Sequence, residues 1–147
     1  MDDPRIRMFL IYDRRHDVDL RDALVAQSLE AKAAFTIVAQ STAGDPEVDG
    51  DERVRTQLRE SDEVLVLCGA HTEESPTVAD EFRVVLEEEK PYVLLWGRRE
   101  IMCTKPPGAK PGDAMYSWTD QILDARVREV LRHPRPRSAA GRKPTRA

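Results

Sequence analysis

Val64-Leu65-Val66-Leu67-Cys68 decides the fold, because all five consecutive side chains are apolar. A parallel strand covered by helices on both faces has this uninterrupted pattern, whereas a strand with one wet face alternates. Ser75-Pro76 follows as a helix start, with serine as the N-cap and proline in the first turn. Val78 and Phe82 then follow helical spacing. The sequence therefore predicts a central parallel strand followed by a helix that ends near Lys90.

On either side of this strand, short apolar runs alternate with helical patterns. The other predicted strands and helices are strands Arg7–Tyr12, Phe35–Ala39, Tyr92–Trp96 and Met115–Ser117, and helices Val18–Ala33, Glu52–Ser61 and Ile122–Leu131. This alternation predicts an α/β fold, namely a flavodoxin-like three-layer sandwich with a central parallel sheet of about five strands. Ligands of such folds bind outside the carboxyl ends of the strands. That rule points to residues 12–17, 69–75 and 97–99.

Size and charge limit the class of protein. A chain of 147 residues suits one domain, predicted over residues 1–132, with a disordered basic tail over residues 133–147. The acidic body makes nucleic-acid binding a poor expectation, although residues 131–147 carry six basic and no acidic residues. No apolar run is long enough for a membrane span, and the polar N-terminus is unlike a secretory signal. Cys68 and Cys103 are expected as free thiols, which predicts a cytoplasmic protein.

Several known sites do not fit the sequence. A phosphoacceptor domain needs an aspartate after the third strand, where Cys68-Gly69 stands instead. The segment Asp13-Arg14-Arg15-His16-Asp17 has no glycine and two acids, so it does not suit the phosphate of FMN. A calcium-like loop beginning at Asp45 has Thr56 where a bidentate carboxylate is needed. The three histidines have no metal-ligand spacing, so we expect neither a metal nor a bound cofactor.

Side chains near the strand ends are the candidate site residues. Glu81 is predicted at the edge of the apolar stripe of its helix, where a fixed anion could stabilise developing positive charge. The candidate binding residues are Tyr12, Asp13, Arg14, Arg15, His71, Thr72 and Ser75. The arginines suit phosphate, yet residues 13–15 could equally form an exposed turn. Thr72 could instead stabilise its own backbone, and Ser75 could serve only as a helix cap.

An ordered set of motifs resembles the TIR domain superfamily. It comprises Ser61-Asp62, the apolar strand, Gly69-Ala70-His71-Thr72, Ser75 six residues before Glu81, Phe9-Leu10-Ile11-Tyr12, Asp17, Lys90-Pro91 and Trp118. The set is most similar to the bacterial TIR-like branch that includes the TIR protein of Thoeris anti-phage defence. The resemblance spans roughly residues 5–132, nearly all of the predicted domain.

This resemblance implies cleavage of the nicotinamide–ribose bond of NAD+, with Glu81 as the catalytic carboxylate and NAD+ as substrate rather than cofactor. It also implies self-association, and a cyclic or conjugated ADP-ribose product that acts on a separate effector protein. Ile11 and Val78 depart from the serine and the aromatic residue usual in the family. The departures leave a non-catalytic TIR-like interaction module as the alternative, and an enzyme for another N-glycosidic nucleotide as a third possibility. Against the acidic body, the diphosphate would be met by Arg14, Arg15, Arg98 or backbone N–H groups.

Overall fold

A computed structural model describes residues 5–41 and 50–132 of the chain, so the predicted basic tail lies outside the described residues. The elements are, in chain order, β1 (Ile6–Ile11), α1 (Val18–Ser28), β2 (Phe35–Gln40), α2 (Gly50–Arg59), β3 (Glu63–Cys68), α3 (Pro76–Glu87), β4 (Tyr92–Trp96), β5 (Met115–Ser117) and α4 (Asp120–Arg132). The strands form one parallel sheet in the order β2-β1-β3-β4-β5. The predicted α/β flavodoxin-like sandwich is confirmed.

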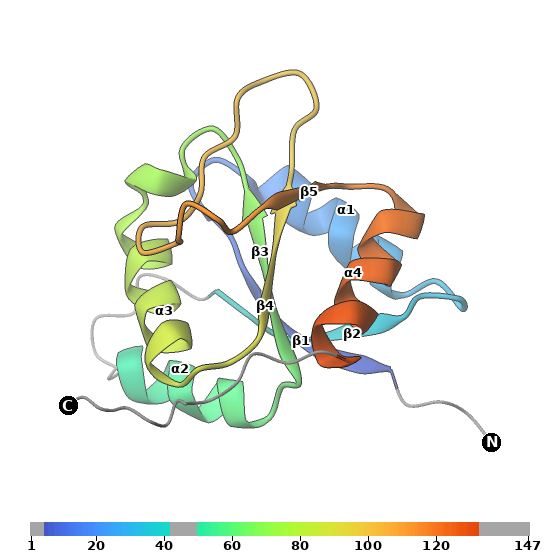
Figure 1. Ribbon diagram of the computed structural model, residues 1–147, viewed down its shortest axis with the longest axis horizontal. Coiled ribbons are helices and arrows are strands. Elements are labelled where there is room, and N and C mark those ends of the chain that lie inside the picture. The colour runs from blue at the N-terminus through green and yellow to red at the C-terminus, as the bar shows by residue number, and fades with distance from the viewer. Residues whose placement is uncertain (1–4, 42–49, 133–147) are drawn as a thin grey trace.

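Strand β3, which contains the apolar run Val64–Cys68, lies at the centre of the sheet. All six residues of β3 are buried, and Val64 is in register with Phe9 of β1 and Tyr92 of β4. In Figure 1, α2 and α3 cover one face of the sheet while α1 and α4 cover the other. The uninterrupted apolar run therefore has helices on both sides, as its pattern predicts.

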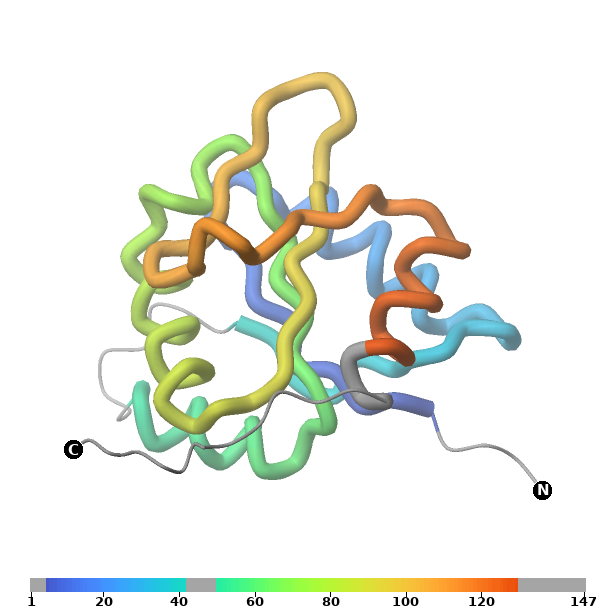
Figure 2. Tube along the Cα trace, in the orientation of Figure 1, coloured from blue at the N-terminus to red at the C-terminus, as the bar shows by residue number. Residues whose placement is uncertain are grey.

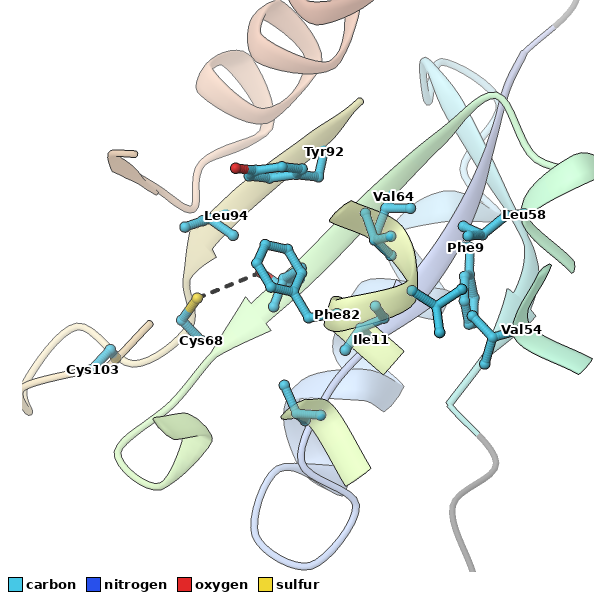
Figure 3. Close-up of a cluster of buried hydrophobic side chains, with 14 residues drawn as sticks. Phe9, Ile11, Val54, Leu58, Val64, Cys68, Phe82, Tyr92, Leu94 and Cys103 are labelled. Atoms are coloured by element: carbon cyan, nitrogen blue, oxygen red, sulfur yellow. Dashed lines mark hydrogen bonds between the residues drawn. The ribbon is translucent and has the colours of Figure 1, made fainter. Parts of the chain in front are cut away.

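Two apolar cores fill the layers, one on each face of the sheet. In the first, alternate residues of β1, β3 and β4 meet Val54 and Leu58 of α2 and Val78 and Phe82 of α3, as Figure 3 shows in part. In the second, the other residues of the same strands meet helices α1 and α4, whose contributions include the fully buried Leu123. The period of two along each strand assigns its residues to the two cores.

Some predicted boundaries are wrong. Helix α1 ends at Ser28 rather than Ala33, and Leu29 follows with 75% exposure. The chain must turn here, because Phe35 pairs with Ile6 across the parallel sheet. The last helix begins at Asp120 rather than Ile122, and Ile122 is 37% exposed. No described helix is long and apolar enough to cross a membrane.

Residues 97–114 leave β4, extend beyond the carboxyl ends of the strands and return past α3 to β5 (Figure 2). Gly108 makes the return possible, because its φ of +96° lies where other residues are strained. A Cβ there would also lie 3.2 Å from Cδ1 of Leu86 on α3. This segment therefore packs against α3.

The strand order creates a crevice between β1 and β3. From β1 the chain crosses to β2 at one side, and from β3 it proceeds to β4 at the other, so the connections diverge at this point. Loops that diverge at the carboxyl ends leave the crevice in which doubly wound folds bind ligands. The fold therefore selects residues 12–17 and 69–75 from the three candidate segments.

Candidate functional site

A pocket of about 450 Å³ lies at this crevice, and we call it the switch-point pocket. The loop after β1, the loop after β3 and the start of α3 contribute its lining, which is Asp13, Arg14, Arg15, His16, His71, Glu74, Ser75, Pro76 and Thr77. Five predicted site residues come together here, namely Asp13, Arg14, Arg15, His71 and Ser75. Its volume is in the range of small-molecule sites.

Asp13 organises the loop after β1. Its carboxylate accepts a hydrogen bond from the Arg15 N–H at 2.9 Å and lies 2.7 Å from Nδ1 of His16. Its backbone carbonyl accepts from the Asp17 N–H at 2.9 Å. Asp13 is 4% exposed, whereas Arg14 and Arg15 are exposed. The alternative of an exposed turn is therefore wrong for Asp13, whose internal bonds hold the two arginines at the pocket.

Two imidazole rings from different loops stack on the pocket wall. The His16 and His71 ring centroids are 4.0 Å apart, with 25° between the planes. Nδ1 of His71 also lies 3.3 Å from Glu74. Sequence reasoning identified His71 but missed His16. Its signal was its place directly after β1, inside the segment that the carboxyl-end rule selects.

Thr72 and Ser75 support the backbone of the second loop. Oγ1 of Thr72 accepts from the Gly69 N–H at 2.7 Å, and the side chain is fully buried. Oγ of Ser75 accepts from the Val78 N–H at 3.2 Å, which is the predicted N-cap. The interpretation of Thr72 as a support of its own loop and the interpretation of Ser75 as a helix cap are both confirmed. Ser75 also reaches the pocket lining, whereas Thr72 lies below it.

Glu81 is not part of the lining of the switch-point pocket but belongs to α3, the helix whose first residues line it. It is 5% exposed, and Ser41 Oγ donates a hydrogen bond of 2.5 Å to its Oε1. The same hydroxyl oxygen accepts from the Tyr12 N–H at 3.2 Å. Ser41 and Tyr12 line a second pocket of about 420 Å³, and Arg14 lines both pockets. The carboxylate therefore lies at the carboxyl ends of β1 and β2, as expected, but more deeply buried than the edge of a helix stripe.

Arg98, one of the groups expected to meet the diphosphate, binds two carboxylates and a backbone carbonyl of this chain. It donates to Asp17 at 3.0 Å, to Asp19 at 2.8 Å and to the His16 carbonyl at 3.1 Å. Asp17 is 1% exposed, and this burial raises the pKa of its carboxyl, with Arg98 acting in the opposite direction. The guanidinium is thus occupied in joining the loop after β4 to the loop after β1. We call this set the Arg98 clamp.

Replacing Arg98 with glutamine should destabilise the protein in a pH-dependent way. Loss of the guanidinium raises the pKa of Asp17 further above its ordinary value of 3.8. The Asp17 carboxyl then loses its proton at a lower pH in the unfolded chain than in the folded protein. The stability of the variant therefore falls as the pH rises above 3.8. We expect Arg98→Gln to lower the free energy of unfolding by about 2 kcal/mol at pH 7 and by less at pH 4. Urea unfolding of Arg98→Gln beside Arg99→Gln, the exposed neighbour, measures this, and an equal loss at both pH values contradicts it.

Both tryptophans of the chain pack at the carboxyl ends of the strands. The Trp96 indole donates to the Arg98 carbonyl at 2.6 Å, and the Trp118 indole donates to Gln27 of α1 at 2.8 Å. Cys68 is a free thiol, as expected, and its full burial raises the pKa of the thiol. Ile11 and Val78, where the sequence departs from the TIR pattern, are also fully buried. The two departures therefore lie in the core rather than on a pocket wall.

The comparisons with known proteins support one family. Residues 9–100 match the family model described as Thoeris protein ThsB, TIR-like domain. A comparison with curated proteins gave no match. The matched segment runs from β1 to the loop after β4 and contains both walls of the switch-point pocket, Ser41 and Glu81. The chain therefore belongs to the TIR-like domain family of the Thoeris protein ThsB, and its role is a TIR-type role in defence.

Proposed function

We propose that this protein cleaves the bond between nicotinamide and ribose in NAD+, with Glu81 as the essential carboxylate. The ADP-ribose part then yields a cyclic or conjugated messenger that activates a separate effector protein. The observation that carries the proposal is the position of Glu81. It is a buried carboxylate, held by Ser41 at the carboxyl ends of β1 and β2, on the helix whose first residues line a pocket with two arginines.

The chemistry follows from where charge develops. When the C1′–N bond breaks, its electron pair leaves with nicotinamide and the ribose carbon becomes positively charged. A carboxylate in a water-poor site stabilises this charge more strongly than an exposed one would, because the surrounding dielectric is low. In this position the Glu81 carboxylate accepts a hydrogen bond from the Ser41 hydroxyl. A ribose hydroxyl has the same chemistry and is the partner that we expect for it.

Arg14 and Arg15 suit the diphosphate of NAD+. Both side chains are exposed at the mouth of the pocket, and the buried Asp13 fixes the backbone that carries them. The guanidinium group matches phosphate oxygens in charge and geometry. Arg14 also lines the second pocket, together with Ser41. The Arg14 side chain therefore borders both the switch-point pocket and the pocket of the serine that binds Glu81.

Release of nicotinamide from NAD+ by the purified full chain tests the proposal. We expect Glu81→Gln to reduce the rate at least 100-fold, a size typical of removing one electrostatic stabiliser. Asp80→Asn is the matched control, because Asp80 precedes Glu81 on α3 and is exposed. The assay is run over a range of protein concentrations, with and without lysate from phage-infected cells. Circular dichroism of each variant confirms the fold.

The possible outcomes separate the alternatives. If the wild type and Glu81→Gln are equally silent under every condition, NAD+ cleavage is overturned and the interaction module takes its place. If the wild type releases a base from another nucleotide in a mass-spectrometric panel, the substrate is a different N-glycoside. Release from NAD+ that Asp80→Asn retains and Glu81→Gln loses supports the proposal.

A further inference from the structure

The stacked histidines form a second chemical group in the switch-point pocket, distinct from Glu81. The His16 and His71 rings come from loops after different strands, yet their centroids are 4.0 Å apart. Each ring has a carboxylate beside Nδ1, Asp13 for His16 and Glu74 for His71. The two pairs differ in strength, because Asp13 is buried at 2.7 Å whereas Glu74 is exposed at 3.3 Å. His16 is therefore the ring that the fold holds more firmly.

The contact with Asp13 fixes which nitrogen of His16 carries the proton. An ionised carboxylate only accepts hydrogen bonds, so Nδ1 of His16 carries the hydrogen. The lone pair of the neutral ring is then on Nε2. The His16 ring lines the pocket and 41% of its side chain is exposed, so a molecule in the pocket can contact the ring. An imidazole positioned by a buried carboxylate is the usual form of a general base.

The position of His16 is fixed from its other side as well. The Arg98 clamp donates to the His16 carbonyl at 3.1 Å, so the backbone is held while the ring stacks on His71. The ring is thus restrained by a carboxylate at one edge, a second imidazole on one face and a guanidinium at its backbone. No catalytic step proposed above uses this arrangement.

Short connections join His16 to Glu81. The Tyr12 N–H donates to Ser41 Oγ, which donates to Glu81. Asp13, the next residue in the chain, binds His16. The base and the carboxylate therefore depend on two adjacent backbone positions at the end of β1. Glu81 is also only about 7.5 Å along the axis of α3 from Pro76 on the pocket wall, at 1.5 Å per residue.

We propose that His16 is the general base of this pocket, taking the proton from the hydroxyl or amine that captures the ribose carbon. The inference rests on the proposed function, because it concerns the second half of the same reaction. The C1′–N bond breaks and its electron pair leaves with nicotinamide. The captor forms the new bond to C1′, and its proton moves to Nε2 of His16. Asp13 is a positioning residue for His16, and no oxidant, reductant or metal takes part.

The charged groups around His16 set the conditions of the test. They are Asp13, Arg14 and Arg15 on its own loop, His71 and Glu74 from the loop after β3, and Arg98 at its carbonyl. A base must be neutral to accept a proton, so turnover should fall as the pH is lowered through the range in which imidazole protonates, about 5 to 8. A variant without the base should lose this dependence.

The experiment compares His16→Gln, His16→Ala and Glu81→Gln with the wild type as full-length protein. Nicotinamide and the ADP-ribose product are measured from pH 5 to pH 9, and the His16→Ala assays are repeated with added imidazole. We expect His16→Gln to reduce turnover at least 100-fold at pH 8 and to flatten the pH profile, and imidazole to restore part of the rate to His16→Ala. Glu73→Gln is the matched control, since Glu73 is exposed, lies next to Glu74 and is not part of the pocket lining, and the variant should stay within about two-fold of wild type.

The results distinguish failure of the inference from failure of the proposed function. If Glu81→Gln is inactive while His16→Gln keeps the wild-type rate and pH profile, the base assignment is overturned and NAD+ cleavage stands. If His16→Gln is slow with an unchanged profile, and imidazole restores nothing to His16→Ala, His16 is structural and the inference is again overturned. If the wild type releases no nicotinamide under any condition, both fail together.

Discussion

Replacing Glu63 with glutamine should stabilise the protein by about 4 kcal/mol at pH 8 and leave its stability unchanged near pH 4. Glu63 begins β3 and is fully buried, and neither carboxylate oxygen has a hydrogen-bond partner. Burial, with a smaller effect from Asp62, raises the pKa of Glu63 from 4.5 to about 9. The folded protein therefore holds a neutral carboxylic acid at physiological pH.

The sign of the effect on stability follows from the number of protons that Glu63 binds in the folded and unfolded states. Between pH 4.5 and about 9 the unfolded chain has lost this proton while the folded chain retains it. Stability therefore decreases as the pH rises through this window, by up to about 1.4 kcal/mol per pH unit. Glutamine resembles the protonated acid in shape and polarity but has no proton to lose. The variant removes the pH-dependent loss and keeps the packing.

Urea unfolding of the wild type and Glu63→Gln at pH 4, 6 and 8 measures the effect. Glu60→Gln is the matched control, because Glu60 is exposed and lies three residues earlier. The control should follow the wild type at each pH. A Glu63→Gln variant that gains no stability at pH 8 would show that the Glu63 carboxylate is ionised and stabilised in the fold.

Replacing Gly69 with alanine should cost about 3 kcal/mol of stability. A Cβ on Gly69 would overlap Oδ2 of Asp17 and lie 2.8 Å from its Cγ and Oδ1. Asp17 cannot move aside without breaking its bond to Arg98, and it is 1% exposed. The added methyl group therefore displaces either β3 or the Arg98 clamp, which holds the loop of the switch-point pocket.

A double-mutant cycle isolates the contact between Gly69 and Asp17. In an Asp17→Ala background the carboxylate is gone. Adding Gly69→Ala to that variant should therefore lower its free energy of unfolding by less than about 1 kcal/mol. Gly112→Ala is the control, because its Cβ would meet no atom within 4 Å. Thermal or urea unfolding of the four proteins measures the cycle. Equal costs of Gly69→Ala in the two backgrounds would place the strain elsewhere.

The sheet could be predicted from the sequence because its signal is local. The apolar run of β3 and the cap at Ser75 each follow from a few adjacent residues. Strand β5 was also predicted with its observed bounds, Met115–Ser117. The end of α1 was predicted wrongly, because it depends on the pairing of Phe35 with Ile6, and no periodicity within the helix reports that contact.

The site could be predicted only in part, because its key contacts join distant segments. The carboxyl-end rule pointed to three loops, of which the strand order selects two, and the TIR resemblance pointed to Glu81. Ser41, the partner of Glu81, lies 40 residues earlier in the chain. The bond of Arg98 to Asp17, from 81 positions away, could not be predicted from any local pattern either. Glu63 carried no sequence signal of burial, since a charged residue at a strand start is ordinarily solvated.

The packing of the tryptophans provides a built-in optical probe. The chain has two tryptophans, and both lie where the strands end, Trp96 bonded to the Arg98 carbonyl and Trp118 bonded to α1. Arg98 also donates a hydrogen bond to the His16 carbonyl. A ligand that shifts the loop after β1 therefore changes the surroundings of Trp96 through Arg98. Intrinsic emission of the unlabelled protein thus follows events at the pocket side of the sheet, and nucleotide titrations can be recorded without an attached dye.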